Sequence, residues 1–210
     1  MRGKMISVEG IEGVGKSTLL PLMAETLRQS GITVVETREP GGTVIGEQIR
    51  NVLLHQKEAA IAPVTELTMM FAARAQHLEE VIKPALHSGH WVLCDRFTDS
   101  TYAYQGGGRQ LPSSLIEKIE HAVIESFQPD HTLLLDLDVI EGLNRAAQTG
   151  AKDRFESESI AFFNRVREAY LSRASQFDRI TVLSAAPPLM EVSRTVVTWI
   201  ADIRGHAVDE

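Results

Sequence analysis

The feature that most constrains this chain is the run from Gly10 to Thr18, which fits the pattern G-x-x-x-x-G-K-[ST]. An apolar run over residues 5–8 precedes it, and apolar residues at helical spacing follow it. A loop between a strand and a helix turns its backbone N–H groups onto a phosphate, and its glycines adopt conformations that a side chain would block. The run therefore predicts a nucleotide phosphate site formed by Gly10, Ile11, Glu12, Gly13, Val14, Gly15, Lys16, Ser17 and Thr18.

The chemistry of this loop rests on Lys16 and Ser17. Lys16 is expected to place a positive charge near the transferred phosphate, and Ser17 to offer a hydroxyl ligand to Mg²⁺. The helix that begins there adds the positive end of its dipole. Motifs this short do occur by chance in unrelated loops, but here a strand-like run and a helical segment flank the motif as its mechanism requires.

Strand-like runs alternate with helical segments along the chain. This pattern predicts a three-layer α/β fold with a parallel sheet of about five strands and helices on both faces. The length of 210 residues fits one domain, residues 1–210. Sheets of this kind bind ligands at the carboxyl ends of their strands. The expected strands are residues 5–9, 32–37, 91–95, 132–136 and 180–184.

Composition argues against several classes of function. A formal net charge of −7, with no basic run or stripe, argues against binding of nucleic acid through its backbone. The single cysteine, Cys94, lies in an apolar run, so we expect a buried thiol in a reducing compartment. No basic-then-apolar leader opens the chain and no apolar stretch approaches about 18 residues, so we expect a cytoplasmic protein without a membrane span.

Further motifs follow the phosphate loop. The chain has T-R-E-P-G-G-T over residues 37–43, D-R-F over 95–97, A-Y-Q-G-G-G-R over 103–109 and D-R-F-E over 153–156. A short, polar and basic stretch around the last of these, residues 148–156, predicts a lid. In these motifs the chain closely resembles the bacterial thymidylate kinases, and the resemblance spans nearly the whole chain in the family's order.

The resemblance implies a P-loop nucleoside monophosphate kinase. It implies transfer of the γ-phosphoryl group of ATP to the 5′-phosphate of dTMP, with Mg²⁺, to give dTDP on the way to dTTP. The expected partners are these small molecules and a second copy of the chain in a homodimer, with no nucleic acid and no membrane.

Two arginines at predicted strand ends suit the acceptor phosphate. Arg38 and Arg96 can each bond two phosphate oxygens at once, although either could instead form a surface salt bridge. Asp95 is expected to orient Arg96 and the hydrated Mg²⁺, and Glu12 to face the acceptor sugar. The catalytic set is thus Lys16, Arg96, Arg154, Asp95 and Glu12, with Ser17 and Asp95 at the metal.

The acceptor base is expected to meet Arg74, a charge on an otherwise apolar helical stripe. By resemblance Arg74 would bond a thymine carbonyl, with Thr101 and Gln105 at the polar edge of the ring, and Tyr104 and Ser100 nearby. The family places an aromatic residue where this chain has Met70, so either Met70 or the adjacent Phe71 would cover the base, and Met70 could equally be plain core.

The donor side requires a further cation. Eukaryotic relatives carry an arginine in the phosphate loop where this chain has Gly13, so Arg154 of the lid, supported by Lys152, is expected to approach the transferring phosphoryl group. Alternatively, Lys152 and Arg154 could be exposed residues on a solvated loop without a catalytic role. Arg145 could contact adenine through a cation–π interaction or could be a surface residue.

Three rival functions remain open on the sequence, and the first is another nucleoside monophosphate kinase of similar fold. A deoxynucleoside kinase of similar fold would need a carboxylate to take a hydroxyl proton, and Asp95 or Glu12 could do so. A nucleotide-switched binding module would hold ATP in the loop and use Arg38 to bind a carboxylate of a partner. If the acceptor is instead a nucleoside monophosphate, its phosphate is largely ionised at neutral pH, so the reaction needs no strong general base.

Overall fold

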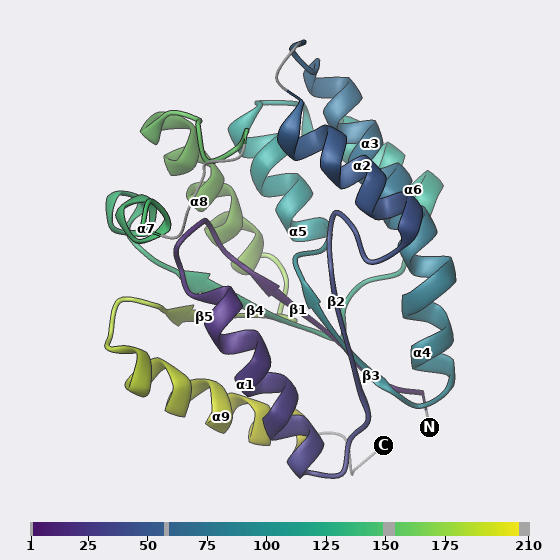
Figure 1. Ribbon diagram of the computed structural model, residues 1–210, viewed down its shortest axis with the longest axis vertical. Coiled ribbons are helices and arrows are strands. Elements are labelled where there is room, and N and C mark those ends of the chain that lie inside the picture. Colours follow the sequence, from purple (N-terminus) through teal and green to yellow (C-terminus); the bar gives the residue numbers. More distant parts are fainter. Residues whose placement is uncertain (1, 57–58, 149–153, 206–210) are drawn as a thin grey trace.

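The computed structural model describes residues 2–56, 59–148 and 154–205. Its centre is one parallel sheet in the order β2-β3-β1-β4-β5 (Figure 1). The predicted α/β class with five parallel strands is confirmed, and each strand lies within two residues of its predicted bounds. The strands are β1 (Met5–Glu9), β2 (Val34–Arg38), β3 (Trp91–Asp95), β4 (His131–Asp136) and β5 (Ile180–Ser184).

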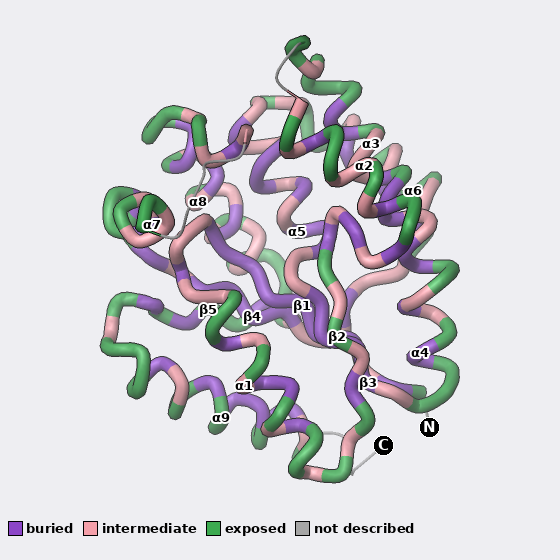
Figure 2. Tube along the Cα trace, viewed as in Figure 1, coloured by how far each residue is buried: buried purple, intermediate pink, exposed green. Residues whose placement is uncertain are grey.

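Helices cover both faces of the sheet. On one face α1 (Lys16–Gln29) and α9 (Leu189–Gly205) pack side by side (Figure 1). On the other face α8 (Ile160–Ala174) contacts β4 and β5, and α4 (Lys83–His87) contacts β3. Every residue of β1 is buried, as the deep colour of this strand in Figure 2 shows, so its apolar side chains form the middle of the core.

The remaining helices lie in the chain segments that follow β2, β3 and β4. They are α2 (Val44–His55), α3 (Pro63–His77), α5 (Thr98–Thr101), α6 (Ser113–Ile124) and α7 (Val139–Ala146). Two π-helical segments were not predicted, η1 (Leu78–Ile82) and η2 (Tyr102–Gly108). Such segments are uncommon and occur preferentially at functional sites. The second of them carries Tyr104 and Gln105, so it positions two of the predicted site residues.

Cys94 is buried in β3, as predicted, and packs with Met5, Val92 and Leu86. Within the described residues, the helices are all too short or too polar for a membrane span.

Candidate active site

The run from Gly10 to Thr18 is a loop that leaves the carboxyl end of β1 and enters α1. Gly15 immediately precedes α1 with a φ of 96°, which lies in the left-handed region that favours glycine. Gly13 has a φ of 75°, and a Cβ atom there would lie 1.9 Å from the carbonyl oxygen of Gly142 in α7. The loop therefore needs glycine at position 13 both for its backbone conformation and for its contact with α7.

Lys16 lies at the start of α1 with its ammonium group turned back over the loop. Its Nζ donates hydrogen bonds to the carbonyl oxygens of Gly10 at 2.9 Å and Ile11 at 3.1 Å. Burial, together with the positive charge of Arg96, lowers the pKa of Lys16 to about 8. An anion placed beside this group would restore its charge, which is the property expected of a phosphate ligand.

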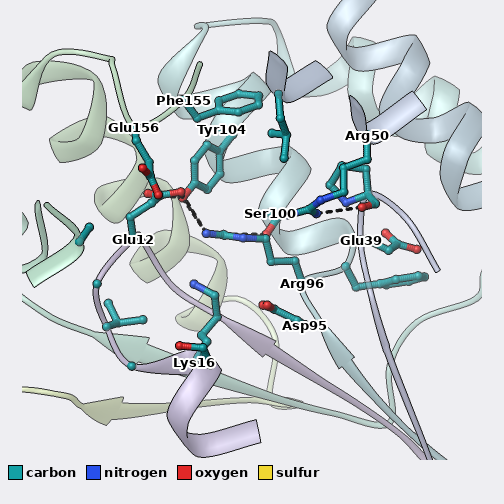
Figure 3. Close-up of a pocket in the computed structure, with 18 of the residues that line it drawn as sticks. Glu12, Lys16, Glu39, Arg50, Asp95, Arg96, Ser100, Tyr104, Phe155 and Glu156 are labelled. Carbon is teal, nitrogen blue, oxygen red and sulfur yellow. Dashed lines mark hydrogen bonds and ion pairs between the residues drawn. The ribbon is translucent and has the colours of Figure 1, made fainter. Parts of the chain in front are cut away.

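The loop borders a cavity of about 550 Å³, a size that suits a small-molecule site. Figure 3 shows Lys16, Asp95 and Arg96 around one open space, with Tyr104 and Glu12 on its far side. Most of the predicted site residues border this cavity, and they come from the loop, β3, α3, α5, η2 and α7. These are Glu12, Gly13, Val14, Gly15, Lys16, Ser17, Thr18, Met70, Arg74, Asp95, Arg96, Ser100, Thr101, Tyr104, Gln105 and Arg145.

Arg96 is the central cation of the cavity. Its NH2 group donates to Glu12 at 3.1 Å and to the Tyr104 hydroxyl at 3.1 Å, and its NH1 group donates to Tyr170 at 3.0 Å and to Ser100 at 3.2 Å. The backbone of Arg96 has a φ of 70°, a strained value for a residue with a side chain. A held guanidinium group of this kind is ready to bind an anion with little loss of conformational freedom.

A second layer holds these partners in place. The buried carboxylate of Glu9 accepts hydrogen bonds from Ser100 at 2.6 Å, the Phe97 backbone N–H at 2.7 Å and Tyr170 at 2.9 Å. Burial, with the nearby charge of Asp99, raises the pKa of Glu9 to about 7. Sequence reasoning did not single out Glu9, although a carboxylate at the end of a buried, mostly apolar strand is a signal of its own.

Arg74 is buried, with 3% of its side chain exposed, and is paired with Glu39 from the loop after β2. Its Nε donates to Glu39 at 2.7 Å and its NH1 group to Thr101 at 3.1 Å. The other oxygen of Glu39 lies 3.0 Å from Nδ1 of His77. The structure therefore brings Arg74 and Thr101 together at the cavity, and Glu39, which sequence reasoning missed, fixes the direction of the guanidinium group.

The structure separates Met70 from Phe71. Met70 borders the cavity, whereas the ring of Phe71 is buried in a separate cluster with Leu67 and Ile116. Consecutive helical residues point about 100° apart, so only one of the two can face the cavity. The alternative in which Phe71 covers the ligand does not match this geometry.

The arginine near the acceptor site also differs from expectation. Arg38 is half-exposed, pairs with Glu47 at 2.8 Å and does not border the cavity. Arg50 of α2 borders it instead (Figure 3). Its NH1 group donates to the carbonyl oxygen of Pro40 at 2.9 Å, and burial lowers its pKa. An arginine on an amphipathic helix gives no sequence signal, because a surface position looks the same.

The predicted lid falls partly outside the described residues, since 149–153, with Lys152, are not among them. Arg154 does not border the cavity in this structure. It donates from Nε to the carbonyl oxygen of Leu53 at 2.7 Å and pairs with Glu66 at 2.6 Å. The next two residues, Phe155 and Glu156, do border the cavity (Figure 3).

Arg145 borders the outer part of the cavity, in α7. It donates to the carbonyl oxygen of Ala185 at 3.0 Å and pairs with Glu141 one turn earlier at 2.5 Å. These contacts hold the guanidinium plane beside the opening, where a planar ring could stack on it.

Asp95 and Ser17 were predicted to hold Mg²⁺. Both border the cavity, and one carboxylate oxygen of Asp95, Oδ1, is buried without a hydrogen-bond partner among the described residues. No group of three metal-ligating side chains occurs in the described part of the chain. Mg²⁺ characteristically binds one or two protein oxygens and completes its shell with water and phosphate, so this pair fits such an ion.

Comparisons with known proteins agree with this geometry. The family model described as thymidylate kinase matches residues 8–196. A thymidylate kinase of Pseudomonas entomophila is 55% identical over 197 residues, covering 93% of this chain and 94% of the relative. A thymidylate kinase of Alcanivorax borkumensis is 48% identical over 205 residues, covering 97% of this chain and 99% of the relative.

A solved structure gives the same result. The crystal structure of thymidylate kinase from Ehrlichia chaffeensis superposes with a TM-score of 0.77 at 32% identity, covering 98% of this chain and 100% of that one. The match of the family model across most of the chain, the identity to curated relatives and the shared fold all agree. The chain therefore belongs to the thymidylate kinase family.

Proposed function

We propose that this protein transfers the γ-phosphoryl group of ATP to the 5′-phosphate of dTMP, giving dTDP and ADP, as a step toward dTTP. The observation that carries the proposal is one cavity with a phosphate loop on one side and the held guanidinium group of Arg96 on the other. Phosphoryl transfer depends mainly on positioning two phosphates and neutralising their charge. Such a cavity supplies both.

On the donor side, the loop and Lys16 bind the ATP phosphates, and Arg145 stacks on the adenine ring. Ser17 and Asp95 would hold Mg²⁺, which would supply positive charge to neutralise the phosphates of the donor. Lys16 exchanges the carbonyl oxygens of Gly10 and Ile11 for a phosphate oxygen when ATP enters.

On the acceptor side, Arg96 and Arg50 hold the 5′-phosphate, and Ser100 orients Arg96. Glu12, which holds both Arg96 and Tyr104, keeps the guanidinium group aligned beside the acceptor sugar. The attacking phosphate oxygen is already largely anionic at neutral pH, so its activation needs no proton transfer to a side chain. Arg74 donates to a thymine carbonyl, Thr101 and Gln105 lie at the polar edge of the ring, and Met70 covers its face.

Arg154 acts on the transferring phosphoryl group only after it leaves Glu66. In the present structure its ion pair with Glu66 keeps the cation away from the phosphate loop. We therefore propose that lid closure exchanges this carboxylate for the phosphoryl group. We also propose a homodimer in the cytoplasm, as the resemblance implies.

The direct test is ADP release from ATP and Mg²⁺ with single acceptors. We expect strong release with dTMP and much weaker release with UMP, CMP, AMP, GMP and thymidine. Preference for another monophosphate would retain the chemistry but remove the roles given to Arg74 and Gln105. Activity on thymidine alone would overturn the acceptor-phosphate proposal, and slow ATP hydrolysis indifferent to dTMP would indicate a nucleotide switch.

The lowered pKa of Lys16, about 8, predicts how ATP binding depends on pH. Bound phosphate raises this pKa again, so binding takes up a proton whenever the free lysine is neutral. Below pH 8 the affinity for ATP is expected to be flat, and between pH 8 and 9 it should fall by about tenfold per pH unit at most. Calorimetry with a non-hydrolysable ATP analogue measures this, and in Lys16→Met the fall should vanish. A flat profile in the unaltered protein would contradict the lowered pKa.

A further inference from the structure

Glu66 is a buried carboxylate that the proposed mechanism leaves without a role in the substrate site. It lies in the first turn of α3, and its side chain is 0% exposed. Its oxygens accept hydrogen bonds from Nε2 of Gln105 at 2.8 Å and from Nε of Arg109 at 3.2 Å, and it pairs with Arg154 at 2.6 Å. An anion held by two guanidinium groups and one amide is well paired for a buried charge.

The contact with Gln105 fixes which end of its amide faces the ligand. A side-chain amide has a donor end and an acceptor end of nearly equal size, and an unconstrained amide can turn over to offer either. A carboxylate can only accept, so the NH₂ end of Gln105 must face Glu66. The carbonyl oxygen Oε1 then lies at the end of the amide away from Glu66, and it is the acceptor that Gln105 can offer to a ligand in the cavity that it borders.

An acceptor at this place selects for a ring nitrogen that carries a proton. Thymine and uracil present an N3–H donor on their polar edge, whereas cytosine presents a lone pair at N3. With the donor groups of Arg74 on the neighbouring carbonyl, the pair Arg74 and Gln105 is complementary to a carbonyl next to an N–H. The opposite orientation of Gln105 would favour cytosine at N3.

We propose that Glu66 is a positioning residue for base selection, acting through the amide orientation of Gln105. This inference rests on the proposed function, because it assumes that the base of the acceptor lies against Gln105. It adds a residue that does not touch the substrate. Glu66 also holds Arg154 and Arg109, whose guanidinium groups lie 4.5 Å and 5.5 Å from the ring centre of Phe155 at the cavity edge, so the same carboxylate joins the base site to the predicted lid.

The test compares two ligands that differ at the base edge, dTMP and 5-methyl-dCMP, in the unaltered protein and in Glu66→Gln. Glutamine at position 66 keeps the shape but offers both a donor and an acceptor, so Gln105 can turn over. We expect the dissociation constant for dTMP to rise roughly tenfold while that for 5-methyl-dCMP falls or stays constant. The mismatch of Arg74 with the 4-amino group is the same in both proteins and cancels from the comparison.

The matched control is Glu120→Gln, which also removes a buried carboxylate. Glu120 accepts hydrogen bonds from Tyr102 and Gln128 and does not border the cavity. In Glu120→Gln the ratio of the affinities for dTMP and 5-methyl-dCMP should equal that of the unaltered protein. In a Gln105→Ala background, Glu66→Gln should likewise leave the ratio unchanged, because the residue through which it acts is gone.

An equal loss of affinity for both ligands in folded Glu66→Gln would overturn the proposal and make Glu66 a purely structural residue. If this variant fails to fold, the side-chain amide of Gln105 is observed by NMR in the unaltered protein with dTMP bound. Nuclear Overhauser contacts from its NH₂ protons to the Arg109 side chain support the proposal, and contacts to the thymine N3 proton alone overturn it. Failure of the unaltered protein to phosphorylate dTMP would instead refute the proposed function, so the two failures are distinguishable.

Discussion

Replacing Lys16 with methionine is expected to lower the turnover number with ATP and dTMP by about 10³-fold, because a preorganised charge beside the transferring phosphate is lost. Methionine keeps most of the length of the side chain, so the path of the loop is retained while the ammonium group is removed. Within the described residues, the hydrogen bonds of the Lys16 ammonium group go to the carbonyl oxygens of Gly10 and Ile11 in its own loop. The dissociation constant for dTMP should therefore remain within about twofold of its original value.

Steady-state ADP release and calorimetry with dTMP measure the two effects separately. A folded Lys16→Met protein with weakened dTMP binding would place this lysine at the acceptor rather than at the donor. An unchanged turnover number would remove the loop from the chemistry altogether.

Replacing Arg96 with methionine is expected to weaken the use of dTMP about as strongly as the Lys16 substitution lowers turnover. Four hydrogen bonds to neighbouring side chains hold the guanidinium group in place. Two charge-assisted hydrogen bonds from it to a phosphate would together contribute about 3–6 kcal/mol. Specificity for dTMP, measured as kcat/KM, should fall by about 10³-fold. The Michaelis constant for ATP should change far less, because Arg96 is placed at the acceptor.

The variant should still fold. Without Arg96, Glu12 keeps its hydrogen bonds from the Tyr104 hydroxyl at 2.7 Å and 2.8 Å, and Ser100 keeps its hydrogen bond to Glu9. Methionine meets the same strained φ as arginine, so the substitution isolates the charged group. A suitable control is Arg28→Met, which breaks a half-exposed ion pair with Glu36 and should leave kcat/KM unaltered. Equal losses toward both substrates in Arg96→Met would indicate a structural role.

The fold followed closely from the sequence because its signals are local. The bounds of β1, β3 and β5 agree with the predicted ones, since each is a short apolar run next to a polar turn. The strand predicted over 32–37 instead covers Val34–Arg38, because its partner β3 begins at Trp91, opposite Val34, and ends at Asp95, opposite Arg38. A pairing register of this kind depends on a strand more than fifty residues away and has no local signal.

The site was predictable where a motif fixes the backbone, and less so where helices meet. The predicted apolar helical stripe contained Arg74, which is indeed buried, but the π-helical segment η1 follows α3 directly and interrupts the regular helix. Whether Met70 or Phe71 faces the cavity depends on the rotation of α3 against its neighbours. Arg50 rather than Arg38 borders the cavity because Arg38 pairs with Glu47 away from it, and because of how α2 packs. Both are tertiary contacts, which helical periodicity does not report.

The close approach of Gly13 to Gly142 has a consequence for protein engineering. Relatives that carry an arginine in the phosphate loop suggest an obvious graft at position 13, yet a Cβ atom there would lie 1.9 Å from a backbone oxygen of α7, with no flexible side chain to yield. Conversely, a Cβ atom at Gly142 would lie 2.8 Å from the carbonyl oxygen of Glu12. The loop and α7 therefore form an interlocked pair, and a chimaera that exchanges one without the other should lose its fold at this junction before it gains a catalytic cation.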